Sequence, residues 1–254
     1  MLIRQPSTRG NRRGSRGVTL MELLIAVTLV SLLSAGIVIS LRVGLSAMNK
    51  ADAKLMANRR VTSVESILEE QIAGIMPVVA DCHPNQNASL LKIAFFQGEP
   101  ASMRLASVYS LQQGSRGTPM ILEFQVIPGE NYQGVRLIVN EHWYTGPQQA
   151  GLSCLGVAPD PLTGVTAVKF APIAIGANSF VLADKLSYCR FTYRELVPEM
   201  PAKWLGHWTH TDSLPNAIRI EMAPLAPDAG RLQPVTLTIP VHVTRPPLQV
   251  YENN

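Results

Sequence analysis

The stretch that decides the fold is Gly14-Ser15-Arg16-Gly17-Val18-Thr19-Leu20-Met21-Glu22, where a basic segment meets a long apolar run. Between Val18 and Leu41 the only charged residue is Glu22. A helix of ~24 apolar residues matches the hydrocarbon thickness of a bilayer. A carboxylate inside a bilayer costs on the order of 2.5–3.5 kcal/mol by insertion scales, so this acid is a functional hypothesis by default.

The charge of the chain is concentrated in its first 17 residues. They hold five arginines and no acid, so they carry +5, whereas the whole chain carries +4 and residues 18–254 carry −1. Basic residues beside a membrane segment stay in the cytoplasm, which places the C-terminal 200 residues on the other side. Because residues 18–254 alone carry no net positive charge, we expect no nucleic-acid binding by that part of the chain.

Two ordinary explanations compete for this N-terminus. A secretory signal peptide has an apolar core of only ~7–15 residues followed by a small-residue cleavage site. Here the apolar run is longer than the core of a signal peptide, and Ser34-Ala35-Gly36 only weakly resembles a small-residue cleavage site. An uncleaved signal anchor explains the run but neither Gly17 nor Glu22.

The basic leader, Gly17, the acid five residues after it and the apolar helix together resemble the processing site of type IV prepilins and pseudopilins. The resemblance implies cleavage between Gly17 and Val18 by the prepilin peptidase, followed by N-methylation of Val18. It also implies that Glu22 faces the N-terminal ammonium of a neighbouring subunit during assembly. This chain departs from the family in one respect, since the residue after the cut is usually Phe. The alternative for Glu22 is that its side chain extends to the membrane interface.

The rest of the chain predicts a helix followed by strands. Nothing forbids one helix from Val18 to Met76, and its second half is amphipathic. The apolar face of that half consists of Val61, Val64, Leu68, Ile72 and Ile75. After Pro77, short segments rich in Val, Ile, Leu, Phe and Tyr alternate with Gly and Pro. The predicted strands are Leu90–Phe96, Met103–Leu111, Met120–Ile127, Val135–Glu141, Val165–Phe170, Lys185–Tyr193, Ala217–Met222 and Val235–Val243.

We therefore expect an α+β, pilin-like fold, in which a long N-terminal helix packs on an antiparallel β-rich head. The expected parts are a leader at 1–17, a transmembrane and assembly half of the helix at 18–41, an amphipathic half at 42–76 and a periplasmic head at 77–254.

Part of the head carries a more specific resemblance. The stretch Leu186-Ser187-Tyr188-Cys189-Arg190-Phe191-Thr192-Tyr193-Arg194 is followed by Trp204, Trp208 and Leu214-Pro215-Asn216-Ala217-Ile218-Arg219-Ile220. This order is similar to the J-type minor pseudopilin of type II secretion systems, in which an aromatic/Arg strand precedes a tryptophan loop and a Leu-Pro-x-Ala strand. Trp204 and Trp208 are candidate contacts for a partner subunit, and the alternative is that they belong to the core.

The three cysteines, Cys82, Cys154 and Cys189, all follow the membrane segment, in a compartment that permits disulfides. Three cysteines allow one bridge with one thiol left over, and the sequence cannot choose the pair. Cys82 and Cys154 both lie in loop-like stretches flanked by Pro and Gly, which favours a bridge between them.

Catalysis and metal binding receive little support. His207 and His210 form a His-x-x-His pair without the Glu and the helical spacing of a zincin. Asp160 and Asp228 lie near turns outside any run of spaced oxygen ligands, which favours turn chemistry over Ca²⁺ binding. We therefore expect no enzymatic activity, no cofactor and no metal site, and the sequence leaves Ca²⁺ binding by the head open.

The function these expectations imply is that of a minor pseudopilin in the bacterial inner membrane. Its leader would be cytoplasmic and its head periplasmic, and its partners would be the prepilin peptidase and other minor and major pseudopilins. It would assemble near the tip of a secretion pseudopilus. The alternatives are a minor pilin of a type IV pilus or DNA-uptake system and, in a different class, a membrane-anchored envelope enzyme or adhesin.

Overall fold

A computed structural model of the chain describes residues 19–83, 89–111, 114–160, 164–177, 179–197, 199–225, 234–243 and 247–248, without the side chains of 49–62, 115 and 116. Contacts within the chain form two compact units, residues 1–53 and 54–254. The division falls inside the first helix. The leader, Gly17 and Val18 lie outside the described residues.

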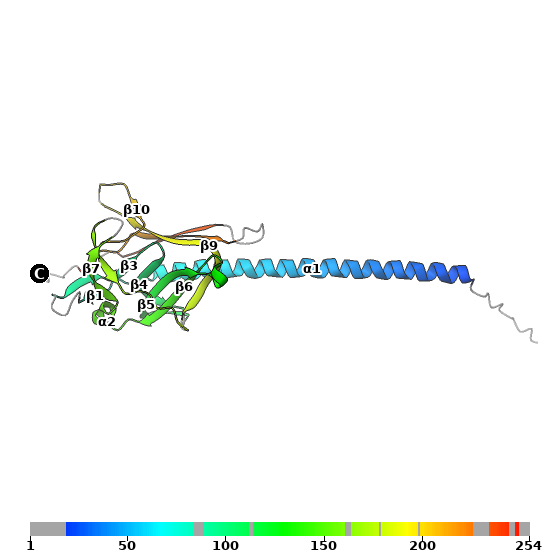
Figure 1. Ribbon diagram of the computed structural model, residues 1–254, viewed down its shortest axis with the longest axis horizontal. Helices are drawn as coiled ribbons and strands as arrows, with labels where there is room; N and C mark the ends of the chain where they lie inside the picture. Colours follow the sequence, from blue (N-terminus) through cyan, green and yellow to red (C-terminus); the bar gives the residue numbers. More distant parts are fainter. Residues whose placement is uncertain are drawn as a thin grey trace, which may run out of the picture. The chain divides into compact units, whose positions relative to one another are not determined.

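Helix α1 spans Leu20–Ala73 (Figure 1). It begins at an N-cap, where the Thr19 hydroxyl accepts a hydrogen bond of 3.3 Å from the backbone N–H of Glu22. With Glu22 at the third helical position, Thr19-Leu20-Met21-Glu22 has the sequence pattern of a capping box. The polar residues that open the apolar run therefore also set where the helix starts.

The end of α1 comes three residues before the predicted Met76. The Gly74 N–H still bonds the Glu70 carbonyl, but Ile75 already forms a β-bridge with Ser107 of the sheet. A Cβ at Gly74 would lie 2.8 Å from the Ser107 hydroxyl, so a glycine is needed where the helix end meets the strand. Pairing with the sheet thus replaces the last predicted turn of the helix.

The second unit is built on an antiparallel sheet of eight strands. Its order is β12-β11-β9-β6-β5-β4-β3, and β10 pairs with β9. The bounds are β3 Phe96–Gly98, β4 Ser102–Ser110, β5 Ser115–Pro128, β6 Val135–Trp143, β9 Phe180–Glu195, β10 Lys203–Leu205, β11 Ala217–Pro224 and β12 Val235–Pro240. A 3₁₀ turn, η1 at Glu130–Tyr132, joins β5 to β6.

One face of this sheet, which we call the inner face, packs on the last turns of α1. Leu68 and Ile72 of the helix are fully buried there. The strands contribute alternate residues, as expected for a sheet with one face in the core. The buried side chains of this core include Met103, Leu105, Leu122, Phe124, Leu137, Val139, Phe191, Tyr193, Ile218 and Ile220.

The opposite, outer face is covered over β4 and β5 by a small subdomain. It consists of the hairpin of β1 (Val79–Cys82) and β2 (Leu91–Ala94), the short helix α2 (Pro147–Gly151), and the pair β7 (Cys154–Pro159) and β8 (Thr166–Phe170). Its core packs Ile93, Phe95 and Ala150 against Ala106 and Ile121 of the sheet.

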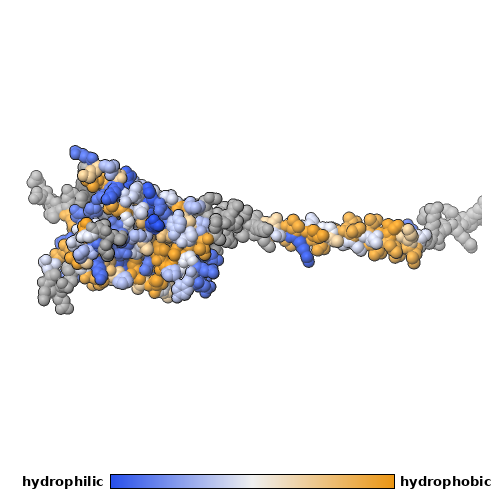
Figure 2. Space-filling view, turned by 45° about the horizontal axis from the view of Figure 1, so that its top comes forward, coloured by the Kyte–Doolittle hydropathy of each residue, from blue (hydrophilic) through white to orange (hydrophobic). Residues whose placement is uncertain are grey.

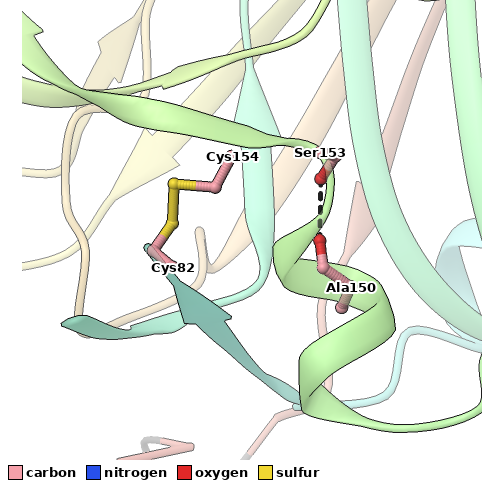
Figure 3. Close-up of a disulfide and its surroundings, with 4 residues drawn as sticks. All are labelled: Cys82, Ala150, Ser153 and Cys154. Atoms are coloured by element: carbon pink, nitrogen blue, oxygen red, sulfur yellow. Dashed lines mark hydrogen bonds between the residues drawn. A yellow bond between two sulfur atoms is a disulfide. The ribbon is translucent and has the colours of Figure 1, made fainter. Parts of the chain in front are cut away.

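A disulfide between Cys82 and Cys154 ties β1 to the start of β7 (Figure 3). Beside it, the Ser153 hydroxyl donates to the Ala150 carbonyl at the end of α2. A Cβ at Gly151 would collide with the Asp81 carbonyl, so α2 and β1 meet backbone to backbone. Both cysteines lie in strands and not in the loops that the sequence suggested, because the Gly and Pro residues near them bound very short strands.

The third cysteine, Cys189, is free and buried in the inner core. Burial raises the pKa of its thiol to about 12. Because the thiolate is the reactive form, this residue acts as a small core side chain.

Removal of the disulfide should destabilise the second unit. The bond closes a separation of 72 residues, for which chain-entropy arguments give roughly 4 kcal/mol of unfolding free energy. In urea unfolding, C82A/C154A should match the reduced wild type and no longer respond to reductant. As a matched control, C189A should keep the response to reductant, and equal urea midpoints for oxidised wild type and C82A/C154A would contradict the assignment.

Candidate functional site

The first unit presents an apolar helix that its own fold does not cover. The segment Leu20–Met48 is long and apolar enough to span a membrane, with a mean hydropathy of 2.5, and none of its most apolar window is buried. Seventeen large apolar side chains along it are exposed, from Leu20 to Met48. In Figure 2 hydrophobic residues dominate the surface of this part of α1. A single N-terminal helix of this kind fits a single-pass membrane anchor.

Two hydroxyl groups within this helix are bonded to its own backbone. The Thr28 hydroxyl donates to the Ile25 carbonyl at 2.9 Å, and the Ser31 hydroxyl donates to the Val27 carbonyl at 2.8 Å. Such bonds satisfy the hydrogen-bonding groups of hydroxyls inside a bilayer, where no water is present. Both residues are therefore compatible with a hydrocarbon environment.

Glu22 lies in the first turn of α1, where the helix dipole favours a negative charge. Its backbone N–H bonds Thr19, whereas no described residue bonds its carboxylate. The acid that the sequence singled out is thus free to meet a cation from outside the chain. The cap formed by Thr19 is the local feature that sequence reasoning missed, although the Thr-x-x-Glu spacing indicates it.

The last turns of α1 are held on the sheet by buried polar bonds as well as by Leu68 and Ile72. Gln71 is fully buried, and its side-chain amide donates to the Glu141 carboxylate at 3.2 Å. The same carboxylate accepts a bond of 2.9 Å from the Ser110 hydroxyl. The Ser107 hydroxyl donates to the Gln71 carbonyl at 2.7 Å. Helix end and sheet are therefore joined through one network.

The predicted amphipathic face is largely the one that docks. Val64 and Ile75 are partly buried against the same core as Leu68 and Ile72. The side chain of Val61 lies outside the described residues. Hydrophobic spacing could not reveal Gln71, since a polar residue carries no such signal.

A second polar network crosses the outer face under the small subdomain. Gln97, Arg104, Glu123 and Asn140 are successive cross-strand partners on β3, β4, β5 and β6. The Arg104 guanidinium is 2% exposed and donates to Glu123 at 2.7 Å. It also lies 5.9 Å from the centre of the Phe170 ring.

Asn140 extends this network to the segment after β8. Its amide donates to the Ala174 carbonyl at 2.8 Å and to Glu123 at 3.2 Å, while its oxygen accepts from Ser179 at 2.6 Å. A buried charge is tolerated when it is paired and hydrogen-bonded, and here each group has partners. The network therefore anchors the outer subdomain and the following loop to the sheet.

The two candidate contact tryptophans differ in exposure. Trp208 lies in the inner core, where its ring packs edge-to-face on Phe96 and its N–H donates to the Ser213 carbonyl. It is a core residue and offers no surface to a partner. Trp204 is half-buried on β10, and the Arg219 guanidinium stacks on it at 3.8 Å.

The histidines and acids named as metal candidates form pairs instead of clusters. His207 lies 3.4 Å from Asp160, and His210 lies 2.8 Å from Glu195. Within the described part of the chain, no three His, Cys, Asp or Glu side chains converge on one point. Asp228 lies outside the described residues.

Comparison with known proteins bears on the N-terminal segment. Residues 12–38 match the family model of the prokaryotic N-terminal methylation motif. The match supports a type IV prepilin-like protein. It spans the junction at Gly17 and Val18 as well as Glu22, and a motif of this kind implies processing by prepilin peptidase and assembly with pilin-like subunits. No curated protein matches the chain in sequence.

The Arg104–Glu123 pair predicts a defined pH dependence of stability. Burial alone would raise the pKa of Glu123, but hydrogen bonds and charge from Arg104, with help from Asn140 and His142, hold it below its usual value. A depressed carboxylate pKa stabilises the fold above the unfolded value of about 4.3, and this contribution is lost as the pH falls through the folded pKa.

The Glu123→Gln variant tests this pair. At pH 7 it should lose about 3–5 kcal/mol of unfolding free energy, because Arg104 is left buried without its counter-charge. In urea unfolding from pH 7 to pH 3, the difference between wild type and variant should shrink below pH 4.5. The matched control Glu69→Gln removes an exposed acid and should leave the unfolding free energy and its pH dependence unchanged. If the stability difference between wild type and Glu123→Gln has the same size at every pH, loss of the charge pair is not its cause.

Proposed function

We propose that this protein is a minor pseudopilin, a structural and non-catalytic subunit of a type II secretion pseudopilus. The single observation that carries the proposal is the uncovered helix Leu20–Met48 with Glu22 in its first turn, whose N-terminal part lies within the matched methylation motif at residues 12–38. A helix used only as an anchor needs neither the processing motif nor an acid at this depth. A helix that must pack among identical or related helices has a use for both.

The role of Glu22 follows from electrostatics in a low-dielectric environment. An unpaired carboxylate in hydrocarbon costs several kcal/mol or takes up a proton, and a facing cation relieves that cost. After cleavage at Gly17, the chain would begin with the ammonium of Val18. Pairing this ammonium with the Glu22 of the adjacent subunit couples entry of each subunit to the neutralisation of a buried charge.

The choice of a secretion pseudopilus rests on the head. The aromatic/Arg stretch, which resembles the J-type minor pseudopilin, lies in β9, and the Leu-Pro-Asn-Ala stretch leads into its partner strand β11. Arg190, Thr192 and Arg194 of β9 lie outward while Phe191 and Tyr193 fill the inner core. The proposal places the subunit near the tip of the pseudopilus, with its head in the periplasm. The same leader serves type IV pili and DNA-uptake machines, so a minor pilin is the alternative.

Substitutions at the helix start separate charge pairing from capping. Glu22→Ala and Glu22→Gln should both reach the membrane but enter the assembled fibre roughly tenfold less than wild type, since one missing ion pair of about 1.4 kcal/mol has that effect. Thr19→Val removes the cap hydroxyl and keeps the acid, so it should assemble nearly normally. Recovery of each variant in cross-linked fibres measures this, and wild-type assembly of Glu22→Gln would contradict the charge-pairing role.

The class of function is tested by exchanging the helix. An unrelated single-pass anchor in place of residues 18–41 should abolish function in a deletion strain. Restored function would favour an anchored enzyme or adhesin. In the same strain, loss of protein secretion supports the pseudopilus, whereas loss of pili or of DNA uptake supports the minor-pilin alternative.

A further inference from the structure

We propose that the outer face of β9 and β11 is a docking surface for a carboxylate-rich segment of a partner protein. We call this surface the arginine face and define it as Tyr188, Arg190, Arg194, Trp204 and Arg219. The inference concerns the head alone and goes beyond assembly through the N-terminal helix. It holds for a pseudopilin and for a minor pilin alike.

The arginine face arises from alternation along the C-terminal half of β9, from Tyr188 to Arg194. Tyr188, Arg190 and Arg194 are exposed, whereas the residues between them, Cys189, Phe191 and Tyr193, are buried in the inner core. On β11 the same alternation places Arg219 and Glu221 outward between Ile218, Ile220 and Met222. Since alternate residues share a face of a strand, the arginines of both strands emerge on one side of the sheet.

Arg219 connects three strands of this face. It pairs in register with Thr192 of β9, while Trp204 of β10 pairs with Arg194. Because β10 and β11 lie on opposite sides of β9, the Arg219 side chain must cross β9 to stack on Trp204 at 3.8 Å. The stack holds a guanidinium flat against the sheet beside two outward arginines.

Among the described residues, the three arginines of this face form no ion pair within 4 Å. No described acid forms an ion pair with Arg190, Arg194 or Arg219, although Glu221 is the register partner of Arg190. By contrast, the other outer-face arginines of the sheet, Arg104 and Arg136, are both paired with acids. Arg104 and Arg136 are thus neutralised by acids of their own chain, whereas Arg190, Arg194 and Arg219 form no such pair within the described residues.

Two polar atoms under this face are also without partners. The Nε of Arg219 and the hydroxyl of Thr192 are buried, make no hydrogen bond within the protein, and belong to register partners. Leaving such groups unpaired costs about 1–3 kcal/mol each. These two buried atoms are out of reach of a partner, whereas the exposed guanidinium groups of Arg190 and Arg194 are open to an incoming carboxylate.

The composition of the face favours a protein partner over a nucleic acid. Arg, Tyr and Trp are the residue types that dominate the binding energy of protein interfaces. Residues 77–254 hold 12 Lys and Arg against 13 Asp and Glu, so the head lacks the overall positive charge expected of a phosphate-binding domain. A local positive patch on a nearly neutral head fits a local acidic patch on another protein.

Photocrosslinking from the exposed Tyr188 tests the proposal in the full-length protein in its host envelope. With p-benzoylphenylalanine at position 188, the expected product is a cross-link to a protein peptide that carries several Asp or Glu residues. R190E/R194E should reduce it roughly tenfold or more. The matched control K92E/K169E changes the net charge equally at exposed lysines of β2 and β8 and should have no effect.

A charge exchange completes the test. Reversal of the acids in the cross-linked peptide to Lys should restore the product with R190E/R194E and weaken it with the wild-type face. The proposal is overturned by a cross-link to nucleic acid or lipid, by a peptide without acids, by absence of any product, or by a product indifferent to R190E/R194E. Urea unfolding of each variant separates loss of binding from loss of fold. Both arginines are exposed, and R190E places a second glutamate opposite Glu221, so a loss of no more than about 1 kcal/mol of unfolding free energy is expected.

Discussion

The apolar surface of residues 20–48 is the constraint on which this protein depends. Each of its seventeen large apolar side chains stays about half exposed or more among the described residues. Burial of one such side chain stabilises by about 1.5–3 kcal/mol, so exposure of all of them to water would cost tens of kcal/mol. That is more than the total stability of an ordinary domain. The segment must therefore lie in lipid or among other helices, and everything else in the chain has to be compatible with one of these environments.

In the second unit, the C-terminal turns of α1 are packed on the sheet by apolar contacts and hydrogen bonds. Leu68 and Ile72 supply the apolar contact, and Gln71, Ser107, Ser110 and Glu141 join helix and sheet through hydrogen bonds. A buried polar network of this kind is costly when any member is missing, so it favours one docked arrangement over sliding alternatives. On the other side of the same sheet, the Arg104 network and the disulfide fix the small subdomain. Both layers of the head are thereby joined to the sheet that receives the C-terminal turns of α1.

Much of the architecture follows from sequence pattern alone. All eight predicted strands correspond to strands of the structure, because their alternation or apolar density is strong, and the match of residues 12–38 agrees with the motif read at Gly17 and Glu22. The pattern did not predict β1, β3, β10 and α2, which have three to five residues each, too few for a periodic signal. It also missed β7, whose Cys154-Leu155-Gly156-Val157-Ala158-Pro159 is interrupted by Gly and Pro. Trp208 became a core residue and Trp204 a stacking partner of Arg219, a distinction that no local pattern carries. Burial of Gln71, Arg104 and Glu141 could not be predicted from the sequence either, because it depends on hydrogen-bond partners that are distant in the chain.

The measurement that tests the central claim most directly is the mass and N-terminal sequence of the protein from its host membrane, with and without the prepilin peptidase. We expect a chain that begins at N-methylated Val18 when the peptidase is present and retains residues 1–17 when it is absent. A chain that keeps residues 1–17 in both strains, or is cut elsewhere in both, would contradict the account and leave the helix as an ordinary anchor.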